Sequence, residues 1–306
     1  MFGVMKSTQA VVLSAQALRV PVPSFNIPYL PIMEPVVRAL RDMDSFGLIA
    51  VARPEWEKFE ARSLQAVSAE YEKRKLPRHT RLHLDHTPVI DEDRKQVDYL
   101  AIIKDALAAG YQSVMVDGSR LPLPWNIEAT RTVVDMAHAK GVAVEGELGA
   151  VMGHEAGPLP PYEELFRSGK GFTDPAEAVR FVKETGVDWL SVAIGNIHGA
   201  ISGAAKSSKK VEARLNIEHL RKIRDLAHVP LVLHGGSGIN TACLKEAFWN
   251  GIVRINVGTS IRQPYEQFKD KSIPKAQQAV YEEMVRLIRE ELGTEGTAAK
   301  LGSDAD

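Results

Sequence analysis

The sequence predicts a (β/α)8 TIM barrel, an α/β fold in which eight parallel strands alternate with helices. Eight short and nearly continuous apolar runs follow one another along the chain, as expected for strands buried on both faces. Amphipathic stretches separate these runs, which favours parallel pairing. The 306 residues suffice for one such barrel. We therefore expect a single domain over residues 1–306, with a C-terminal helical extension at about 263–306.

The predicted strands cover, in chain order, residues 20–26, 47–52, 81–86, 113–117, 143–148, 189–195, 230–234 and 252–257. The predicted helices cover residues 32–43, 56–73, 97–109, 127–139, 175–185, 217–227 and 244–250. Thr173-Asp174-Pro175 is typical of a helix start, because proline fits the first helical position. A doubly wound open sheet is the alternative fold, but its first strand ordinarily leads into a glycine-rich turn. Here that strand ends in Ser24-Phe25-Asn26.

Composition excludes several classes of partner. The formal net charge is -1, which gives no reason to expect nucleic acid or an anionic membrane surface as a partner. A single cysteine, Cys243, excludes an internal disulfide and fits a reducing compartment. We see no signal peptide, and no run approaches the roughly 20 apolar residues of a membrane span. We therefore expect a cytoplasmic protein that acts on a small molecule.

Three histidines stand where an apolar run gives way to glycine or polar residues: His86, His198 and His234. The carboxyl ends of barrel strands meet on one face, so these side chains should converge. Three neutral imidazoles with an open fourth position are typical of catalytic zinc. We predict a site for Zn²⁺ or another divalent metal. His83 alternates with Leu84 and is expected only to fill the barrel interior.

Acidic residues accompany these histidines. Asp85 directly precedes His86, and it either orients an imidazole or carries a proton. Glu145 and Glu147 share one face of the fifth predicted strand, and Asp117 ends the fourth. Buried carboxylates need partners. For Asp117 and Glu147, metal contact and a structural role remain equally open.

Two loops favour a phosphate site. Gly235-Gly236-Ser237-Gly238 follows the seventh predicted strand, and Asn256-Val257-Gly258-Thr259-Ser260 follows the eighth. In barrels these two loops frequently bind phosphate through backbone N–H groups. We expect substrate contacts from Gly235, Gly236, Ser237, Asn256, Gly258 and Thr259.

Seven ordered segments together resemble the class II, metal-dependent ketose-bisphosphate aldolase family, from about residue 20 to about residue 293. They cover residues 23–26, 83–86, 111–119, 144–149, 198–199, 234–238 and 254–257. The resemblance implies that His86, His198 and His234 hold the catalytic zinc, and that Asp117 and Glu147 match an additional metal position.

The same resemblance implies roles for two further acids. Asp85 would be the acid/base at the hydroxyl being cleaved, and Glu155 matches a loop glutamate that moves the proton at the carbanion carbon. Asn26 and Gly199 would join the loop residues in binding a sugar phosphate. A homodimer or homotetramer is expected, and a monovalent cation is considered as a second cofactor.

The implied reaction is reversible retro-aldol cleavage of a ketose (bis)phosphate into an aldehyde and an enediolate like that of dihydroxyacetone phosphate. Four departures from the family pattern affect substrate recognition. Gly258 stands where the family has an acidic residue, and Ala52 where it has a serine; residues 200–202 lack a lysine often found there, and residues 152–154 lack the usual pair of glycines. Arg53 is a candidate replacement contact. The alternatives are an aldolase for a less phosphorylated keto sugar or keto acid, a metal-dependent hydrolase, and a non-catalytic sugar-phosphate-binding barrel.

Overall fold

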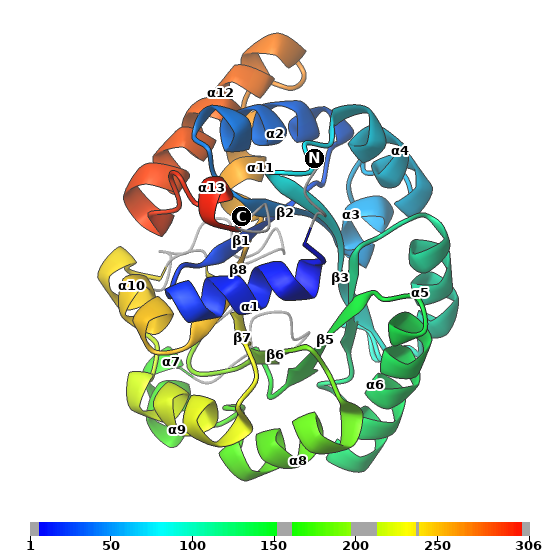
Figure 1. Cartoon of the computed structure of the whole chain (residues 1–306), viewed down its shortest axis with the longest axis vertical. Coiled ribbons are helices and arrows are strands. Elements are labelled where there is room, and N and C mark those ends of the chain that lie inside the picture. The colour runs from blue at the N-terminus through cyan, green and yellow to red at the C-terminus, as the bar shows by residue number, and fades with distance from the viewer. Residues whose placement is uncertain (1–5, 152–160, 197–212, 237–238, 302–306) are drawn as a thin grey trace.

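The computed structural model describes residues 6–151, 161–196, 213–236 and 239–301. Eight parallel strands pair in chain order and close through β1 and β8. A ring of helices surrounds them (Figure 1). The predicted (β/α)8 barrel is therefore confirmed, and the open-sheet alternative is wrong.

All eight predicted strands are present and almost completely buried. They are β1 (Val22–Asn26), β2 (Gly47–Val51), β3 (Thr80–Pro88), β4 (Ser113–Asp117), β5 (Ala143–Leu148), β6 (Trp189–Val192), β7 (Leu231–Leu233) and β8 (Ile252–Val257). Their outward side chains pack against the helices in one extended apolar core. Apolar runs that are buried on both faces explain why the strands were predictable from the sequence.

The helices of the surrounding layer are α2 (Met33–Asp42), α3 (Arg53–Glu57), α4 (Leu64–Arg74), α5 (Tyr99–Ala108), α6 (Leu123–His138), α7 (Tyr162–Ser168), α8 (Pro175–Thr185), α9 (Ile217–Ala227), α10 (Thr241–Trp249) and α11 (Thr259–Glu266). Residues 56–73, predicted as one helix, instead contribute to α3 and α4. The break falls before Ser63, whose side chain accepts a hydrogen bond from the Ala66 N–H and so starts a new helix. Helix α7 was not among the predicted helices.

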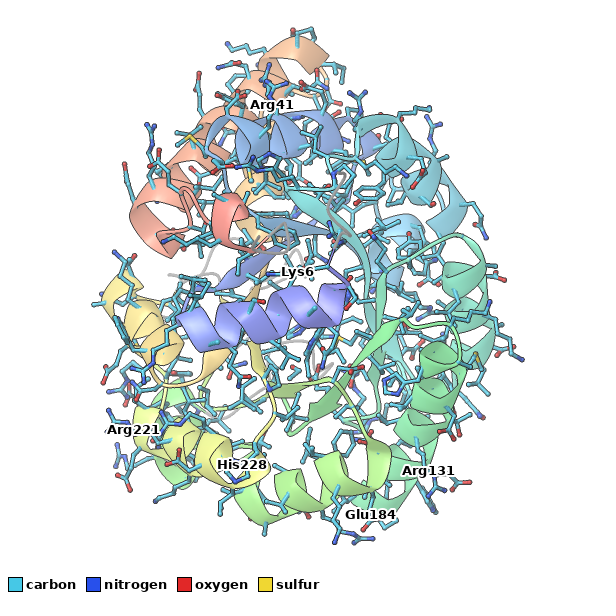
Figure 2. All side chains as sticks on the ribbon, in the orientation of Figure 1. Lys6, Arg41, Arg131, Glu184, Arg221 and His228 are labelled. Carbon is cyan, nitrogen blue, oxygen red and sulfur yellow. The ribbon has the colours of Figure 1, made fainter. Side chains whose placement is uncertain are left out.

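One helix, α1 (Thr8–Leu18), precedes the barrel and closes the amino-terminal end of its strands. The Trp189 indole donates to Gln9 Oε1 at 2.7 Å, and buried Arg81 donates to the Lys6 carbonyl at 2.9 Å. Figure 1 shows α1 crossing the near end of the barrel, and Figure 2 places Lys6 beside this helix. Helix α1 was not among the predicted helices, because its mixture of small, apolar and polar residues shows only weak amphipathic character. A site among the strands must therefore open at the opposite, carboxyl end.

The C-terminal extension contains α12 (Ile273–Arg286), a π-helical turn (Leu287–Leu292) and α13 (Ala298–Leu301). Elsewhere, a short 3-10 turn (Leu30–Ile32) precedes α2. Helix α12 packs outside α2 (Figure 1). There the Tyr281 hydroxyl donates to Asp42 at 3.0 Å, and the Arg38 guanidinium lies 4.3 Å from the Tyr281 ring centre. In the described part of the chain, no helix has the length and apolar character that crossing a membrane requires.

Candidate active site

A bulge in β3 turns two adjacent side chains into the barrel. Leu84 pairs with Val114 and Thr87 with Val116, so β3 has one more residue than β4 between these pairs. Successive side chains of a regular strand point to opposite faces. The extra residue allows both Asp85 and His86 to face the interior. His86 has a φ of 25°, a backbone conformation that costs about 1–3 kcal/mol in a residue other than glycine and that clusters at functional sites.

Two of the three predicted metal ligands converge in this structure. His86 Nε2 lies 2.6 Å from His234 Nδ1. The opposite nitrogen of His234, Nε2, lies 2.8 Å from Glu145 Oε1. Glu145 therefore favours the His234 tautomer that carries its hydrogen on Nε2 and donates it to the carboxylate. Nδ1 is then left to coordinate a metal, an arrangement common for metal-bound imidazoles.

Carboxylates surround the other side of His86. Its Nδ1 atom lies 3.7 Å from both Asp117 Oδ2 and Glu147 Oε2. Asp117 is fixed by Ser119, whose N–H and hydroxyl both donate to Oδ1 at 2.9 and 2.6 Å. Glu147 Oε2 is buried and has no hydrogen-bond partner among the described residues.

Two overlapping sets of side chains have the donors to hold a cation: Asp85 with His86 and His234, and His86 with Asp117 and Glu147. In each set, one donor atom per residue lies within 4.8 Å of the others. Imidazole nitrogen together with carboxylate oxygen suits zinc and related divalent metals. The buried Asp85 Oδ1 and Glu147 Oε2 atoms, without hydrogen-bond partners in the described chain, fit the same interpretation.

The pKa values of this cluster reflect excess negative charge. Burial by itself would lower the pKa of His86, but the charges of Asp85, Glu147 and Asp117 outweigh it and raise that pKa to about 10. Burial and the neighbouring Asp117 raise the pKa of Glu147 well above its usual range. Burial opposes ionisation of Asp85 too, yet His86 and other neighbouring cationic groups hold its pKa well below the usual value. The cluster favours positive charge at its centre.

Four predicted site residues, Glu155, His198, Gly199 and Ser237, lie outside the described residues. The chain that leads toward His198 is described as far as Asn196, four residues after the end of β6. The Asn196 side chain accepts a hydrogen bond from the Ile194 N–H at 2.8 Å and donates to the His234 carbonyl at 3.0 Å. The chain therefore reaches residue 196 directly beside His234.

Below the cluster lies a buried polar layer that sequence reasoning missed. Arg254 Nη1 lies 2.8 Å from both Glu145 Oε2 and His83 Nε2. His83 also contacts Ser113 Oγ at 2.9 Å, and burial followed by the charge of Arg254 lowers the pKa of His83 to about 3. His83 is thus a neutral interior residue, as the sequence predicted. This layer could have been predicted from Arg254, which interrupts the apolar run Ile252-Val253-Arg254-Ile255. A buried cation requires carboxylate partners, so an arginine in a buried strand indicates acidic side chains nearby.

The predicted substrate residues surround Asp85 to different degrees. Asn26 donates to Asp85 Oδ2 at 2.9 Å. Gly258 lies beside Asn26, since a Cβ atom at Gly258 would be 3.7 Å from that of Asn26. Asn256 instead accepts a hydrogen bond from Arg254 at 2.6 Å and so belongs to the polar layer. Thr259 begins α11 directly after Gly258.

The glycine loop after β7 is described only at its start. Gly235 has a φ of 66°, which favours glycine, and a Cβ atom at Gly236 would meet Ile255 at 2.8 Å. Both glycines are therefore required by the backbone of this turn, whatever else they bind.

The turn after β2 differs from what the sequence suggested. Arg53 pairs with Glu57 at 2.8 Å and with Asp91 at 3.3 Å, so the structure does not bring it to Asp85. Glu55 reaches inward instead: its Oε2 atom accepts from the Ala52 N–H at 2.5 Å, and its carboxyl group also interacts with the Asn26 side chain. Glu55 was not among the predicted site residues, because nothing in a Pro-Glu-Trp segment marks such a contact.

Comparisons with known proteins agree with this geometry. A family model described as "Fructose-bisphosphate aldolase class-II" matches residues 6–299. The structure is similar to that of the YdjI aldolase from Escherichia coli K12, with a TM-score of 0.73 and 27% identity, covering 96% of this chain and 99% of that chain. It has the same fold as a fructose-bisphosphate aldolase from Campylobacter jejuni, with a TM-score of 0.72 and 16% identity, covering 97% and 99% of the two chains.

Proposed function

Because the chain belongs to the class II fructose-bisphosphate aldolase family and is therefore a metal-dependent aldolase, we propose that its metal is Zn²⁺, held by His86, His198 and His234. The observation that carries this proposal is the 2.6 Å approach of His86 Nε2 to His234 Nδ1, with Glu145 behind the second ring. Asp117 and Glu147, on the other side of His86, would offer the ion an additional position.

When bound, the zinc ion would act as the electron sink for negative charge that develops on the ketone half of the substrate. Asp85 is the proton carrier in our proposal. One of its oxygens, Oδ2, accepts a hydrogen bond from Asn26, whereas the buried Oδ1 has no such partner among the described residues. Oδ1 is therefore available to accept the proton of a substrate hydroxyl.

In the proposed cleavage, the hydroxyl proton moves to Asp85, the C–O bond of that hydroxyl becomes a carbonyl, and the adjacent C–C bond breaks. The electron pair stays with the ketone half, and Glu155 would then supply a proton to that carbon. Phosphate on the ketone half would be bound by the β7 and β8 loops, from Gly235, Gly236 and Ser237 to Thr259 at the α11 amino terminus.

The preferred substrate is expected to differ from fructose 1,6-bisphosphate at the end far from the metal. Gly258 and Ala52 remove two polar contacts, each worth about 1–3 kcal/mol when a buried partner is left unpaired. A cytoplasmic location and a homodimer or homotetramer remain expectations.

The test is a comparison of kcat/KM for cleavage of fructose, tagatose and other ketose phosphates by the zinc-loaded protein. We expect cleavage of at least one ketose phosphate and poor activity on fructose 1,6-bisphosphate. Efficient cleavage of that substrate, at roughly 10⁴ M⁻¹s⁻¹ or more, would contradict the altered preference. Metal-loaded protein that cleaves none of them would support the non-catalytic alternative.

A further inference from the structure

The carboxyl group of Glu55 enters the site from the turn between β2 and α3. It lies close to the hydrogen-bond partner of the proposed proton carrier, because the Asn26 side chain interacts with the Glu55 carboxyl group and donates to Asp85 Oδ2 at 2.9 Å. Asn26 and Asp85 are both more than nine-tenths buried. The carboxyl groups of Asp85, on β3, and of Glu55, on α3, therefore both lie near the Asn26 amide.

Helix capping explains only part of this position. Glu55 is the third residue of α3, and its Oε2 atom accepts from the Ala52 N–H at the helix start. A glutamate at this position often caps a helix in this way. Capping does not require contact with Asn26, which belongs to another strand and faces the barrel interior.

The charges around Glu55 disfavour a second anion. Burial raises the pKa of the Glu55 carboxyl to about 8, and the charge of Asp85 contributes to the increase. The adjacent cation, Arg53, is directed to Glu57 and Asp91. A phosphate placed here would face the negative charge of Asp85 without Arg53 to balance it, whereas a neutral hydroxyl can donate to a carboxylate or accept from a carboxylic acid.

There is also room for a substrate group at this place. Among the described residues, a Cβ atom built on Gly258 would have only the Asn26 Cβ within 4 Å, at 3.7 Å. The described part of the chain therefore leaves room for a small group at Gly258, beside the Asn26 amide.

We propose that Glu55 is a specificity-determining residue that binds a hydroxyl group on the aldehyde half of the substrate and excludes phosphate from that half. The inference rests on the proposed function. Asp85 takes the proton of the hydroxyl on the carbon that becomes the aldehyde, so Glu55, which lies near Asp85 on the other side of Asn26, faces the aldehyde half. The substrate class is then a ketose phosphate with its phosphate on the ketone half, and the aldehyde product is a polyol without phosphate.

The test uses the zinc-loaded full-length protein in the condensation direction, with dihydroxyacetone phosphate and either glyceraldehyde or glyceraldehyde 3-phosphate. Wild-type kcat/KM should favour glyceraldehyde by about tenfold or more. Glu55→Gln should lower kcat/KM for glyceraldehyde by roughly 5- to 100-fold, the range expected for a lost buried hydrogen bond, and should not lower it for glyceraldehyde 3-phosphate. Glu57→Gln, an exposed position on the same helix, is the matched control and should change both values less than about twofold.

A second measurement separates this inference from the proposed function. Exchange of the dihydroxyacetone phosphate C–H proton with solvent, followed by NMR without aldehyde, reports only on the ketone half and should persist in Glu55→Gln. Absence of exchange in the wild type would overturn the aldolase proposal itself. Exchange accompanied by a wild-type preference for glyceraldehyde 3-phosphate, or by equal losses with both aldehydes in Glu55→Gln, would overturn the role of Glu55. If Glu55→Gln fails to fold, the wild-type preference alone decides.

Discussion

The two ends of the barrel differ in how their buried polar and charged groups are hydrogen-bonded. At the amino-terminal end, the Arg81 guanidinium donates to the carbonyls of Pro77, Thr80 and Lys6, and the Trp189 indole donates to Gln9. At the carboxyl end, Asp85 Oδ1 and Glu147 Oε2 are buried without hydrogen-bond partners in the described chain.

The amino-terminal end of the barrel therefore contributes mainly to stability, and the carboxyl end to function. A buried polar atom without a partner costs about 1–3 kcal/mol, so pairing at the α1 end stabilises the fold. The carboxyl end retains such atoms together with the strained backbone of His86, as is typical where a protein binds a ligand or a metal. Arg254 lies between the two ends of the barrel, where its guanidinium group pairs with Glu145 beneath the histidines. Four substitutions or conditions test this division, beginning with the largest expected effect.

His234→Ala should abolish metal retention and lower kcat by roughly 10³- to 10⁵-fold, because a catalytic metal supplies several kcal/mol of transition-state stabilisation. Metal content after dialysis against a chelator and steady-state kinetics measure both effects, with circular dichroism as the folding control. A variant that keeps its full metal content would show that His234 is not a ligand.

Asp85→Asn should retain the metal but lower C–C cleavage by about 100- to 10,000-fold, because an amide cannot carry the proton. The same metal analysis and kinetics apply. A decrease of less than about threefold would leave Asp85 only the role of orienting its neighbours.

Metal affinity should increase with pH. The pKa of His86, about 10 in the metal-free site, means that this imidazole is protonated at neutral pH and must lose its proton to coordinate an ion. Each proton released on binding should raise the affinity about tenfold per pH unit. Calorimetric zinc titration in buffers of different ionisation enthalpy measures the protons released, and an affinity that does not change between about pH 6 and about pH 8 would contradict this account.

Arg81→Leu should have the smallest effect on catalysis and a clear effect on stability. The change leaves buried carbonyl groups beneath α1 unpaired, so we expect a loss of about 1–3 kcal/mol in the free energy of unfolding. Urea denaturation measures this loss, while kcat/KM and metal content should stay within about twofold of wild type. A stable variant with low activity would show that the two ends are not independent.

Much of the fold was predictable because its signal is local. Each strand is an apolar run bounded by polar or glycine residues, and all eight predicted runs correspond to strands. The short α3 and the weakly amphipathic α1 lack a strong periodic pattern of apolar residues, and neither was predicted as a separate helix.

The site was less predictable because it depends on pairing between strands. The types and order of residues indicated His86, His234 and the neighbouring acids. The bulge that turns both Asp85 and His86 inward exists only in the register between β3 and β4. The inward position of Glu55 likewise depends on Asn26, which lies 29 positions earlier in the chain.

The central claim is that a zinc ion is held by the histidine cluster beside Asp85, and a zinc-edge anomalous difference map of crystals of the zinc-loaded protein tests it most directly. The account predicts a principal peak in contact with His86 Nε2 and His234 Nδ1, with His198 as the third protein ligand. A principal peak among Asp117, Glu147 and His86 Nδ1 that lacks contact with His234, or a peak away from His86 altogether, would contradict it.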